Sequence, residues 1–509
     1  MRASRYVAKN AFLMTVGLFA GRILAFLIFR RMTGTVGVEG MGVWGLSVDL
    51  TSIILTVSTF GLTTLITREI IKDHADTWPI FWAAFRIRLL LGFATYALLA
   101  GYVFATGYDG ATRAAVMLMA VGVLLESTGL ACDSVLQAHE KVEHSTWSQL
   151  VSAAVYFALA WWWLDAGYGV MGVVWANVVS RVARLAIVLP LMVRVAGSWR
   201  GAASARRVGL RWMLRLGLPL FMSTTFGIIS YKIDTVIIME MLGKLAAGVY
   251  TIGHRPLDLL LIVPYLFAAA LFPSLMRYRE LERDGETGHV ERMGERALRY
   301  QHLVVFPMTL FCALAAAPLI RLATSGDADL SASVTVFRVA IWGVPVQAAS
   351  IVFNRLLMTA GQERTFMRIA LASMATNIGL NLLVVPVLGC PGAAMVTVLS
   401  LGVSLVMHRV YLRRAGIVMP VRRALVDGSA AMLLAWAAAV LLGKLVAPGW
   451  GVSWVALPTS GIVPFAVMTV LAGVFYAVAL CGLRVVRRDD LLLVAGLLPG
   501  RRLRPGQNP

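Results

Sequence analysis

Charged residues and cysteines are scarce in this chain of 509 residues. Only 14% of the residues are charged, and the four cysteines lie in apolar surroundings without paired spacing. Neither a disulfide framework nor a metal site is therefore predicted. The sequence also lacks a G-x-x-x-x-G-K-[ST] segment and an H-E-x-x-H segment, which excludes ATP hydrolysis by a P-loop and a zinc protease site. We expect no cofactor and no catalytic residues, so ion gradients, membrane potential or consumption of the product must supply any energy.

Apolar residues, by contrast, dominate the sequence. They make up 59% of it, and the mean hydropathy is +0.78. About fourteen apolar runs of roughly 20 residues recur between residues 8 and 483, and each is long enough to cross a bilayer. The first run lacks the cleavage site of a signal peptide. We therefore predict an all-α polytopic membrane protein with about fourteen transmembrane helices.

The distribution of Lys and Arg predicts the orientation of these helices. With the N-terminus inside, the predicted cytoplasmic segments hold 31 of them and the predicted outer segments hold 6. Such an excess follows the positive-inside rule. It predicts a multi-pass membrane protein with both termini in the cytoplasm. The net charge of +20 is thereby explained without a nucleic-acid partner.

Two sets of matches indicate an internal duplication. Gly42-Val43-Trp44 recurs as Gly248-Val249-Tyr250, 206 positions later. Repeats six helices apart keep the same orientation in a membrane, so they would be parallel repeats. The second set, 220 positions apart, pairs Gly169, Gly172 and Ser180 with Gly389, Gly392 and Ser400.

The duplication predicts the domain organisation. Residues 1–205 would form an N-terminal six-helix lobe and residues 206–420 a C-terminal six-helix lobe. Two additional transmembrane helices would follow over residues 421–484, and residues 485–509 would form a basic cytoplasmic tail.

Two apolar stretches between residues 216 and 275 contain charged side chains. A charge near the bilayer centre costs about 2.5–3.5 kcal/mol on insertion scales, so such residues usually face a bundle interior or a water-filled path. Ion pairs that lock helices together would explain a single such residue, but a cluster on neighbouring helices favours a polar cavity. The polar side chains in these stretches include Lys232, Asp234, Glu240, Tyr250, His254, Arg255 and Asp258.

A second polar face lies on the predicted helix over residues 42–62. Asp49, Ser52 and Thr56 recur at spacings of three and four residues, which places them on one side of a helix. Asp49 favours a water-lined wall over close packing of helices. The 206-residue offset aligns Asp49 with Arg255, and we predict that these opposite charges pair across the cavity.

Other predicted helices carry polar residues that could contact a ligand. Arg22 lies well inside the first apolar run. Arginine binds phosphate oxygens through charge-assisted hydrogen bonds and can bind two at once. A pocket for drug cations would instead need uncompensated carboxylates and aromatic faces. The remaining stripes at helical spacing are Asn177, Arg181 and Arg184, and Ser373, Asn377 and Asn381.

Several segments resemble the polysaccharide-transporter and O-antigen flippase family of the multidrug/oligosaccharidyl-lipid/polysaccharide exporter superfamily. The resemblance covers about residues 5–480. It implies two six-helix lobes in a V around a central cavity lined by helices 1, 2, 7 and 8. The segments that carry it are Ile233–Ile238, Gly248–Tyr250, Ile262–Pro264, Leu271–Leu275, Gln137–Lys141 and Asn377–Ala394.

This resemblance implies a flippase that moves polyprenyl-diphosphate-linked oligosaccharides across the inner membrane by alternating access, for surface polysaccharide biosynthesis. Arg22, Lys232 and Arg255 would then attract the diphosphate. Asp49, Asp234 and Asp258 would hold these cations apart, reset the empty state or couple an ion. The implied partners are the lipid-linked oligosaccharide, membrane lipids, a polysaccharide polymerase and glycosyltransferases. Polar residues for the sugar hydroxyls would include Ser52, Tyr250, His254, Asn377 and Asn381.

Three other functions are compatible with the sequence. A lipid II flippase of the same superfamily also has fourteen helices and a basic cavity. A cation-coupled multidrug antiporter fits less well, because it usually has twelve helices and an acidic ion site. A membrane scaffold without transport would have no use for two repeats with polar faces.

Overall fold

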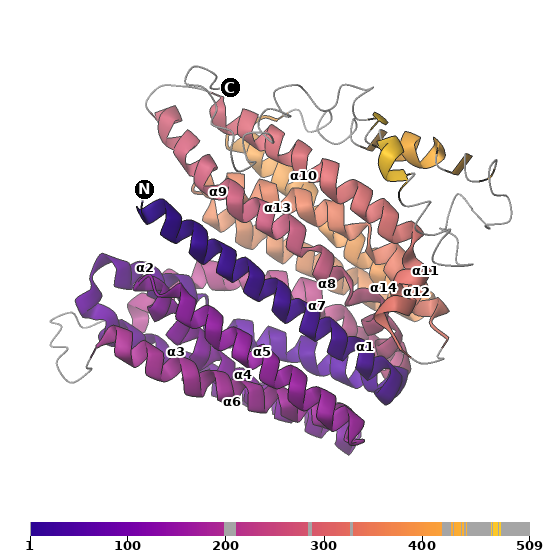
Figure 1. Cartoon of the computed structure of the whole chain (residues 1–509), viewed down its shortest axis with the longest axis horizontal. Coiled ribbons are helices and arrows are strands. Elements are labelled where there is room, and N and C mark those ends of the chain that lie inside the picture. Colours follow the sequence, from indigo (N-terminus) through magenta and orange to yellow (C-terminus); the bar gives the residue numbers. More distant parts are fainter. Residues whose placement is uncertain are drawn as a thin grey trace. The chain divides into compact units, whose positions relative to one another are not determined.

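The computed structural model describes residues 2–197, 210–283, 288–325 and 329–419, together with short stretches between residues 429 and 479. All regular elements in these residues are helices (Figure 1). The first part of the chain contains α1 (Arg2–Thr59), α2 (Leu62–Lys72), the 3-10 helix η1 (His74–Asp76), α3 (Thr77–Ala105), α4 (Gly110–Ala138), α5 (Val142–Asp165) and α6 (Gly169–Ala196). The remainder contains α7 (Leu210–His254), α8 (Leu257–Leu260), α9 (Ile262–Arg283), α10 (His289–Leu314), α11 (Ala316–Ala323), α12 (Ser331–Ala340), α13 (Gly343–Thr359) and α14 (Glu363–Arg414).

Seven helical stretches in the described residues are long and apolar enough to cross a membrane. Three of them have 53, 49 and 51 residues, about twice the length that a bilayer requires. Each of these three contains a glycine with positive φ: Gly37 (68°), Gly243 (84°) and Gly389 (60°). Only glycine adopts such a conformation without strain, so α1, α7 and α14 are each two helices joined at a glycine. The prediction of an all-α polytopic membrane protein is confirmed.

Contacts between α1 and α7 follow the 206-residue offset. A side chain on Gly42 would clash with the carbonyl oxygen of Lys244, and one on Gly248 would clash with the carbonyl oxygen of Val38. Val38 and Lys244 are themselves 206 positions apart, as are the kink residues Gly37 and Gly243. The two helix pairs therefore contact each other through equivalent residues, as expected for a duplicated unit.

A pair of hydrogen bonds nearly follows the second offset: the acceptors Ser180 and Ser400 are 220 positions apart, and the donors Ser152 and Ser373 are 221 positions apart. The Ser152 hydroxyl donates to the carbonyl oxygen of Ser180 at 3.0 Å, and the Ser373 hydroxyl donates to that of Ser400 at 3.2 Å. These contacts support the duplication. The lobe boundaries at residues 205 and 420 fall outside the described residues, as do most of residues 421–484 and all of residues 485–509. The division into lobes therefore stays a prediction.

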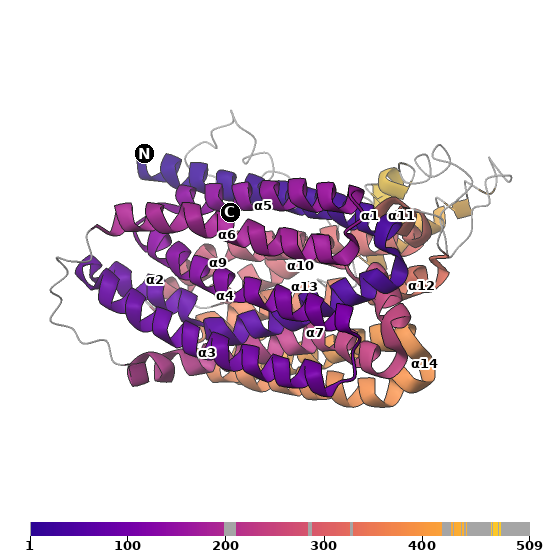
Figure 2. The ribbon, with the colours of Figure 1, turned by 90° about the horizontal axis from the view of Figure 1, so that it is seen from below.

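The chain divides into two compact units by its contacts. The first comprises residues 1–259, 319–340 and 361–407, and the second comprises residues 260–318, 341–360 and 408–509. In the first unit, α3, α4, α5 and α6 pack in succession against one another and against α1 (Figure 2). In the second unit, α9, α10 and α13 pack together. All residues of the candidate site described below belong to the first unit.

Replacement of Gly248 by Ala is expected to destabilise the protein, because the new methyl group meets backbone atoms of α1. Overpacking of this kind typically costs about 1–3 kcal/mol. Gly227→Ala is a matched control in the other half of α7, since a Cβ at Gly227 meets no atom within 4 Å. The control should be neutral or slightly stabilising, because Ala is the better helix former. Melting temperatures of the purified variants would test this, and equal values would contradict the close contact.

Candidate functional site

A cavity of about 400 Å³ lies within the first compact unit, between α1, α4, α5, α6, and the segment that joins α7 to α8. Its α1 wall includes Val48, Ser52 and Leu55, which recur at helical spacing on one face. Its aromatic lining consists of Phe26, Phe29, Trp44 and Tyr156. Its charged and amide side chains are Arg22, Glu126, Asn177, Arg181, Arg255 and Asp258.

Four charged side chains form a cluster at one wall of this cavity. Arg255 Nη2 donates to Asp49 Oδ1 at 2.6 Å, and Arg255 Nη1 lies 3.5 Å from Asp258 Oδ2. Lys232 Nζ lies 3.4 Å from Asp49 and 3.7 Å from Asp258. Each carboxylate thus contacts both cations, and the cluster has no net charge. The predicted Asp49–Arg255 ion pair is present, but it lies within one wall of the cavity rather than across it, because Asp49 does not line the cavity.

Neutral groups complete the hydrogen bonding of the two carboxylates. Thr235 Oγ1 donates to Asp49 Oδ2 at 2.7 Å, and the Tyr231 hydroxyl donates to Asp258 Oδ1 at 2.6 Å. The Arg255 guanidinium carbon lies 5.2 Å from the centroid of the Trp44 ring, within the range of a cation–π contact. Removal of one charged partner from such a buried, hydrogen-bonded ion cluster lowers the free energy of unfolding by several kcal/mol.

A second polar cluster surrounds Asp234, whose side chain is almost fully buried. The Tyr250 hydroxyl donates to Asp234 Oδ2 at 2.7 Å, Asn381 Nδ2 donates to Asp234 Oδ1 at 2.8 Å, and the Thr397 hydroxyl donates to Oδ2. Asn381 also donates to Asn377 Oδ1 at 3.2 Å. No described Lys, Arg or His side chain pairs with Asp234. A buried carboxylate is therefore held here by neutral donors alone.

The cavity's other two arginines differ in their partners. Arg22 is exposed to the cavity and makes no ion pair or hydrogen bond with another described residue. Arg181 pairs with Glu126, which also pairs with Arg184 at 2.5 Å. Arg184 in turn pairs with the buried Asp133. A network of alternating charges therefore runs along the interface of α4 and α6.

Comparison with known proteins identifies the family. A family model described as polysaccharide biosynthesis protein matches residues 7–279, more than half of the chain and all of the cavity lining. The chain belongs to this family. A comparison with curated protein sequences gives no match.

Solved structures share the fold of this polysaccharide biosynthesis protein. The lipid II flippase MurJ in an inward closed conformation aligns with a TM-score of 0.71 at 13% identity, covering 94% of this chain and 100% of MurJ. An inward-facing multidrug resistance MATE family transporter of the MOP superfamily aligns at 0.65 and 16% identity, covering 77% and 93%. A MOP superfamily transporter from Pyrococcus furiosus aligns at 0.60 and 15% identity, covering 81% and 95%. The family member thus has the fold of membrane transporters and flippases.

In the structure of this family member, the predicted site residues lie in three separate places. Arg22, Ser52, Arg255 and Asp258 line the cavity. Asp49 and Lys232 complete the charge cluster behind Arg255, and His254 packs against the rings of Tyr231 and Tyr250, with ring centroids 5.5 and 5.2 Å away. The cluster away from the cavity lining contains Asp234, Tyr250, Asn377 and Asn381. Their functional roles stay predictions.

Several residues of the site are absent from the set predicted from the sequence, and Glu126, Thr397 and Tyr156 are three of them. Glu126 is an acid within an apolar run, the same signal that marks Asp49. Thr397 lies 220 positions after Asn177, so the duplication could have pointed to it. Tyr156 has no such signal, because a tyrosine within an apolar helix is common.

Polar contacts also tie α7 to the turn between α3 and α4. Lys244 Nζ lies 2.6 Å from Asp109 Oδ1, and Glu240 accepts hydrogen bonds from Tyr102 and Tyr108. Glu240 and Lys244 flank the kink at Gly243. On the equivalent helix pair, the turn before α12 contacts α1: Ser325 N donates to Thr33 Oγ1 at 2.9 Å and Ser325 Oγ donates to the Arg30 carbonyl at 2.5 Å.

Proposed function

We propose that this protein is a flippase that moves polyprenyl-diphosphate-linked oligosaccharides across the cell inner membrane for surface polysaccharide biosynthesis. The observation that carries the proposal is the cavity itself. Three arginines and two carboxylates line it, and Arg22 has no carboxylate partner among the described residues. A cavity with an uncompensated guanidinium inside a membrane-spanning unit suits a ligand with an anionic headgroup.

The diphosphate is the part of such a substrate that this cavity would recognise. Arg22 would bind its oxygens, because a free guanidinium offers two parallel N–H donors. Arg255 and Lys232 would contribute less, since both are neutralised by Asp49 and Asp258. Ser52 and the aromatic lining would contact the sugar, and the lipid tail would stay among the membrane lipids.

The cluster around Asp234 would couple transport to a cation gradient. A buried carboxylate without a basic partner is costly, and binding of H⁺ or Na⁺ would remove its net charge. Asn381, Thr397 and Tyr250 come from α14 and the second half of α7, so a change in their hydrogen bonds would move these helices. We therefore assign to Asp234 the coupling role and to the Asp49 cluster the role of an ion-pair support.

The contacts of Glu240 and Lys244 fit one state of an alternating-access cycle. With both termini in the cytoplasm, as the positive-inside distribution indicates, these contacts lie toward the outer side of the membrane. They would hold that side closed while substrate enters from the cytoplasmic leaflet. Glycosyltransferases would supply the substrate there, and a polysaccharide polymerase would consume it after release.

A lipid II flippase is the second candidate, because the MurJ structure aligns over the full length of MurJ. Both candidates would carry a polyprenyl diphosphate, so the headgroup site would be shared. Complementation of a strain depleted of its lipid II flippase would separate them. Growth of that strain would favour the second candidate, whereas surface polysaccharide output without such growth would favour the first.

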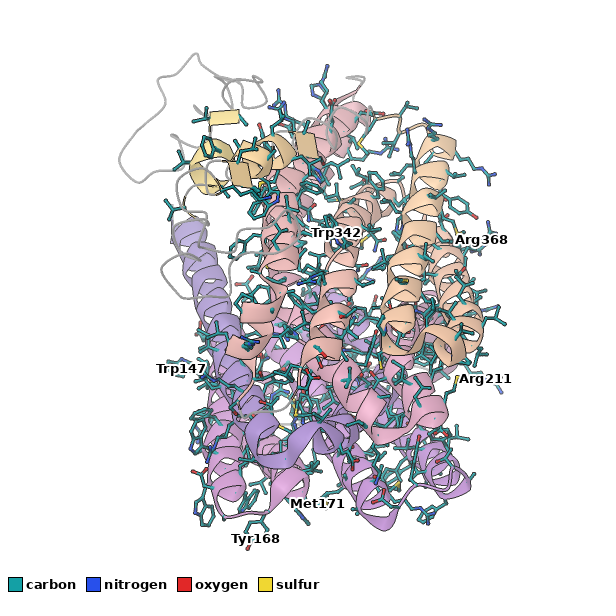
Figure 3. All side chains as sticks on the ribbon, turned by 90° about the vertical axis from the view of Figure 1, so that its right-hand side faces the viewer. Trp147, Tyr168, Met171, Arg211, Trp342 and Arg368 are labelled. Carbon is teal, nitrogen blue, oxygen red and sulfur yellow. The ribbon has the colours of Figure 1, made fainter. Side chains whose placement is uncertain are left out.

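Reconstitution into proteoliposomes with fluorescent polyprenyl-diphosphate saccharides would test the proposal through an assay of leaflet accessibility. Arg22→Gln should slow flipping about tenfold or more, because one charge-assisted contact contributes about 1.5–3 kcal/mol. Arg368→Gln is a matched control: Arg368 is exposed and projects outward from α14 (Figure 3). A wild-type protein that flips no such lipid, or a fully active Arg22→Gln variant, would overturn the proposal.

A further inference from the structure

The three arginines that line the cavity are held by carboxylates to different extents. Arg255 contacts both Asp49, at 2.6 Å, and Asp258, at 3.5 Å. Arg22 contacts no carboxylate among the described residues. Arg181 is intermediate, because its partner Glu126 is shared with Arg184. Arg181 is therefore more easily released to a ligand than Arg255.

Glu126 would remain paired if Arg181 moved away. Arg184 Nη1 lies 2.5 Å from Glu126 Oε1, and the Arg184 side chain is only 4% exposed. Arg184 is anchored on its other side by Asp133, which is 3% exposed. A buried carboxylate left without a partner would be costly, and this arrangement avoids that cost. Release of Arg255 would instead break contacts with two carboxylates.

The surroundings of Arg181 leave it access to the cavity. Its side chain is 31% exposed. One helical turn earlier on α6, Asn177 also lines the cavity, and its side-chain amide makes no hydrogen bond to another described residue. Gly122 of α4 faces these two residues; a Cβ there would lie 3.4 Å from Asn177 Oδ1. Gly122 therefore lies next to Asn177 and Arg181 where α4 and α6 line the cavity.

We propose that Arg181 and Asn177, together with Arg22, bind the diphosphate of the substrate, and that the substrate displaces Glu126 from Arg181. The inference rests on the proposed function and names its binding residues more closely. Arg181 would donate two parallel hydrogen bonds to a phosphate and Asn177 would add an amide donor. Glu126 thus acts as an internal competitor that neutralises Arg181 in the empty cavity.

If Glu126 and the substrate compete for Arg181, replacing Glu126 and replacing Arg181 should change the ligand affinity in opposite directions. In the full-length protein in lipid nanodiscs, Glu126→Gln should tighten binding of geranylgeranyl diphosphate about threefold or more, because it frees Arg181. Arg181→Gln should weaken binding about tenfold, the effect of losing a charge-assisted contact. The double variant should bind no better than Arg181→Gln alone, since the gain requires Arg181. Isothermal titration calorimetry would measure these affinities.

Control variants distinguish a loss of ligand affinity from a failure of the variant to fold. Arg181→Lys retains the charge but loses the paired donors, so its affinity should fall between wild type and Arg181→Gln. Arg368→Gln should bind as wild type does, and geranylgeraniol, which lacks phosphates, should respond to none of the variants. Melting temperatures would show which variants fold. If Arg181→Gln does not fold, the affinity of Glu126→Gln alone tests whether Glu126 competes with the ligand for Arg181.

Two results would overturn the inference. Wild-type affinity in Arg181→Gln, with binding lost in Arg22→Gln, would leave the proposed function standing and remove Arg181 from the site. Unchanged or weaker binding in Glu126→Gln would likewise show that Glu126 does not compete with the ligand. Absence of geranylgeranyl diphosphate binding in the wild-type protein would overturn the proposed function together with the inference.

Discussion

Neutralising both Asp49 and Arg255 is expected to cost less than the sum of the two single replacements. Asp49→Asn leaves Arg255 and Lys232 to share Asp258, and Arg255→Gln leaves two carboxylates with Lys232 alone. Removal of one partner from a buried ion pair typically costs about 3–5 kcal/mol. The double variant removes one charge of each sign, so its cluster is again neutral. We expect a coupling free energy of about 1–3 kcal/mol, in both stability and flipping rate.

The Arg31–Asp165 ion pair provides a matched control for this cycle. Arg31 Nη2 lies 2.5 Å from Asp165 Oδ1, but the two side chains are 41% and 44% exposed. Exposed pairs contribute about 0–1 kcal/mol, so Arg31→Gln and Asp165→Asn should have small and additive effects. Denaturation midpoints and flipping rates of each single and double variant would complete both cycles. Strictly additive effects at Asp49 and Arg255 would contradict the coupling between these two residues.

Asp234→Asn is expected to abolish the dependence of transport on a cation gradient and to slow flipping about tenfold or more. The replacement has almost the same shape, but it brings an amide toward three groups that donate to Asp234 in the wild-type protein. It also removes the only charge of this cluster that could take up a proton or Na⁺. A donor left without an acceptor in a buried site costs about 1–3 kcal/mol.

Flipping rates with and without an imposed pH or Na⁺ gradient would test the role of Asp234. Asp329→Asn serves as the control, because Asp329 is exposed and outside both polar clusters. The control should keep the wild-type response to the gradient. If Asp234→Asn also keeps it, Asp234 has no coupling role and its cluster is structural.

Much of the fold could be predicted because a membrane restricts the possible structures. Backbone groups within a bilayer must be satisfied internally, so apolar runs of about 20 residues predict helices. The duplication added a contact between distant residues, since Asp49 and Arg255 occupy equivalent positions 206 residues apart. This equivalence of positions and the opposite charges of the two residues allowed the pair to be predicted without coordinates.

The division of the charges into separate clusters could not be predicted in the same way. Lys232 and Asp234 are two residues apart, which corresponds to about 200° around an α-helix. They therefore face different neighbours. The structure shows that Lys232 meets Asp49 of α1, whereas Asp234 meets Asn381 and Thr397 of α14. Sequence spacing alone assigns no partner to either face.

The sequence by itself determined the helical, membrane-spanning character of this protein, and its 206-residue repeat predicted the pairing of Asp49 with Arg255. These properties follow from local apolar periodicity and from symmetry between repeats. Tertiary structure decided that Lys232 and Arg255 are neutralised, that Arg22 is not paired with another described residue, and that Glu126 lies between Arg181 and Arg184. Net charge at a site depends on which helix faces meet, and that depends on packing rather than on any single segment.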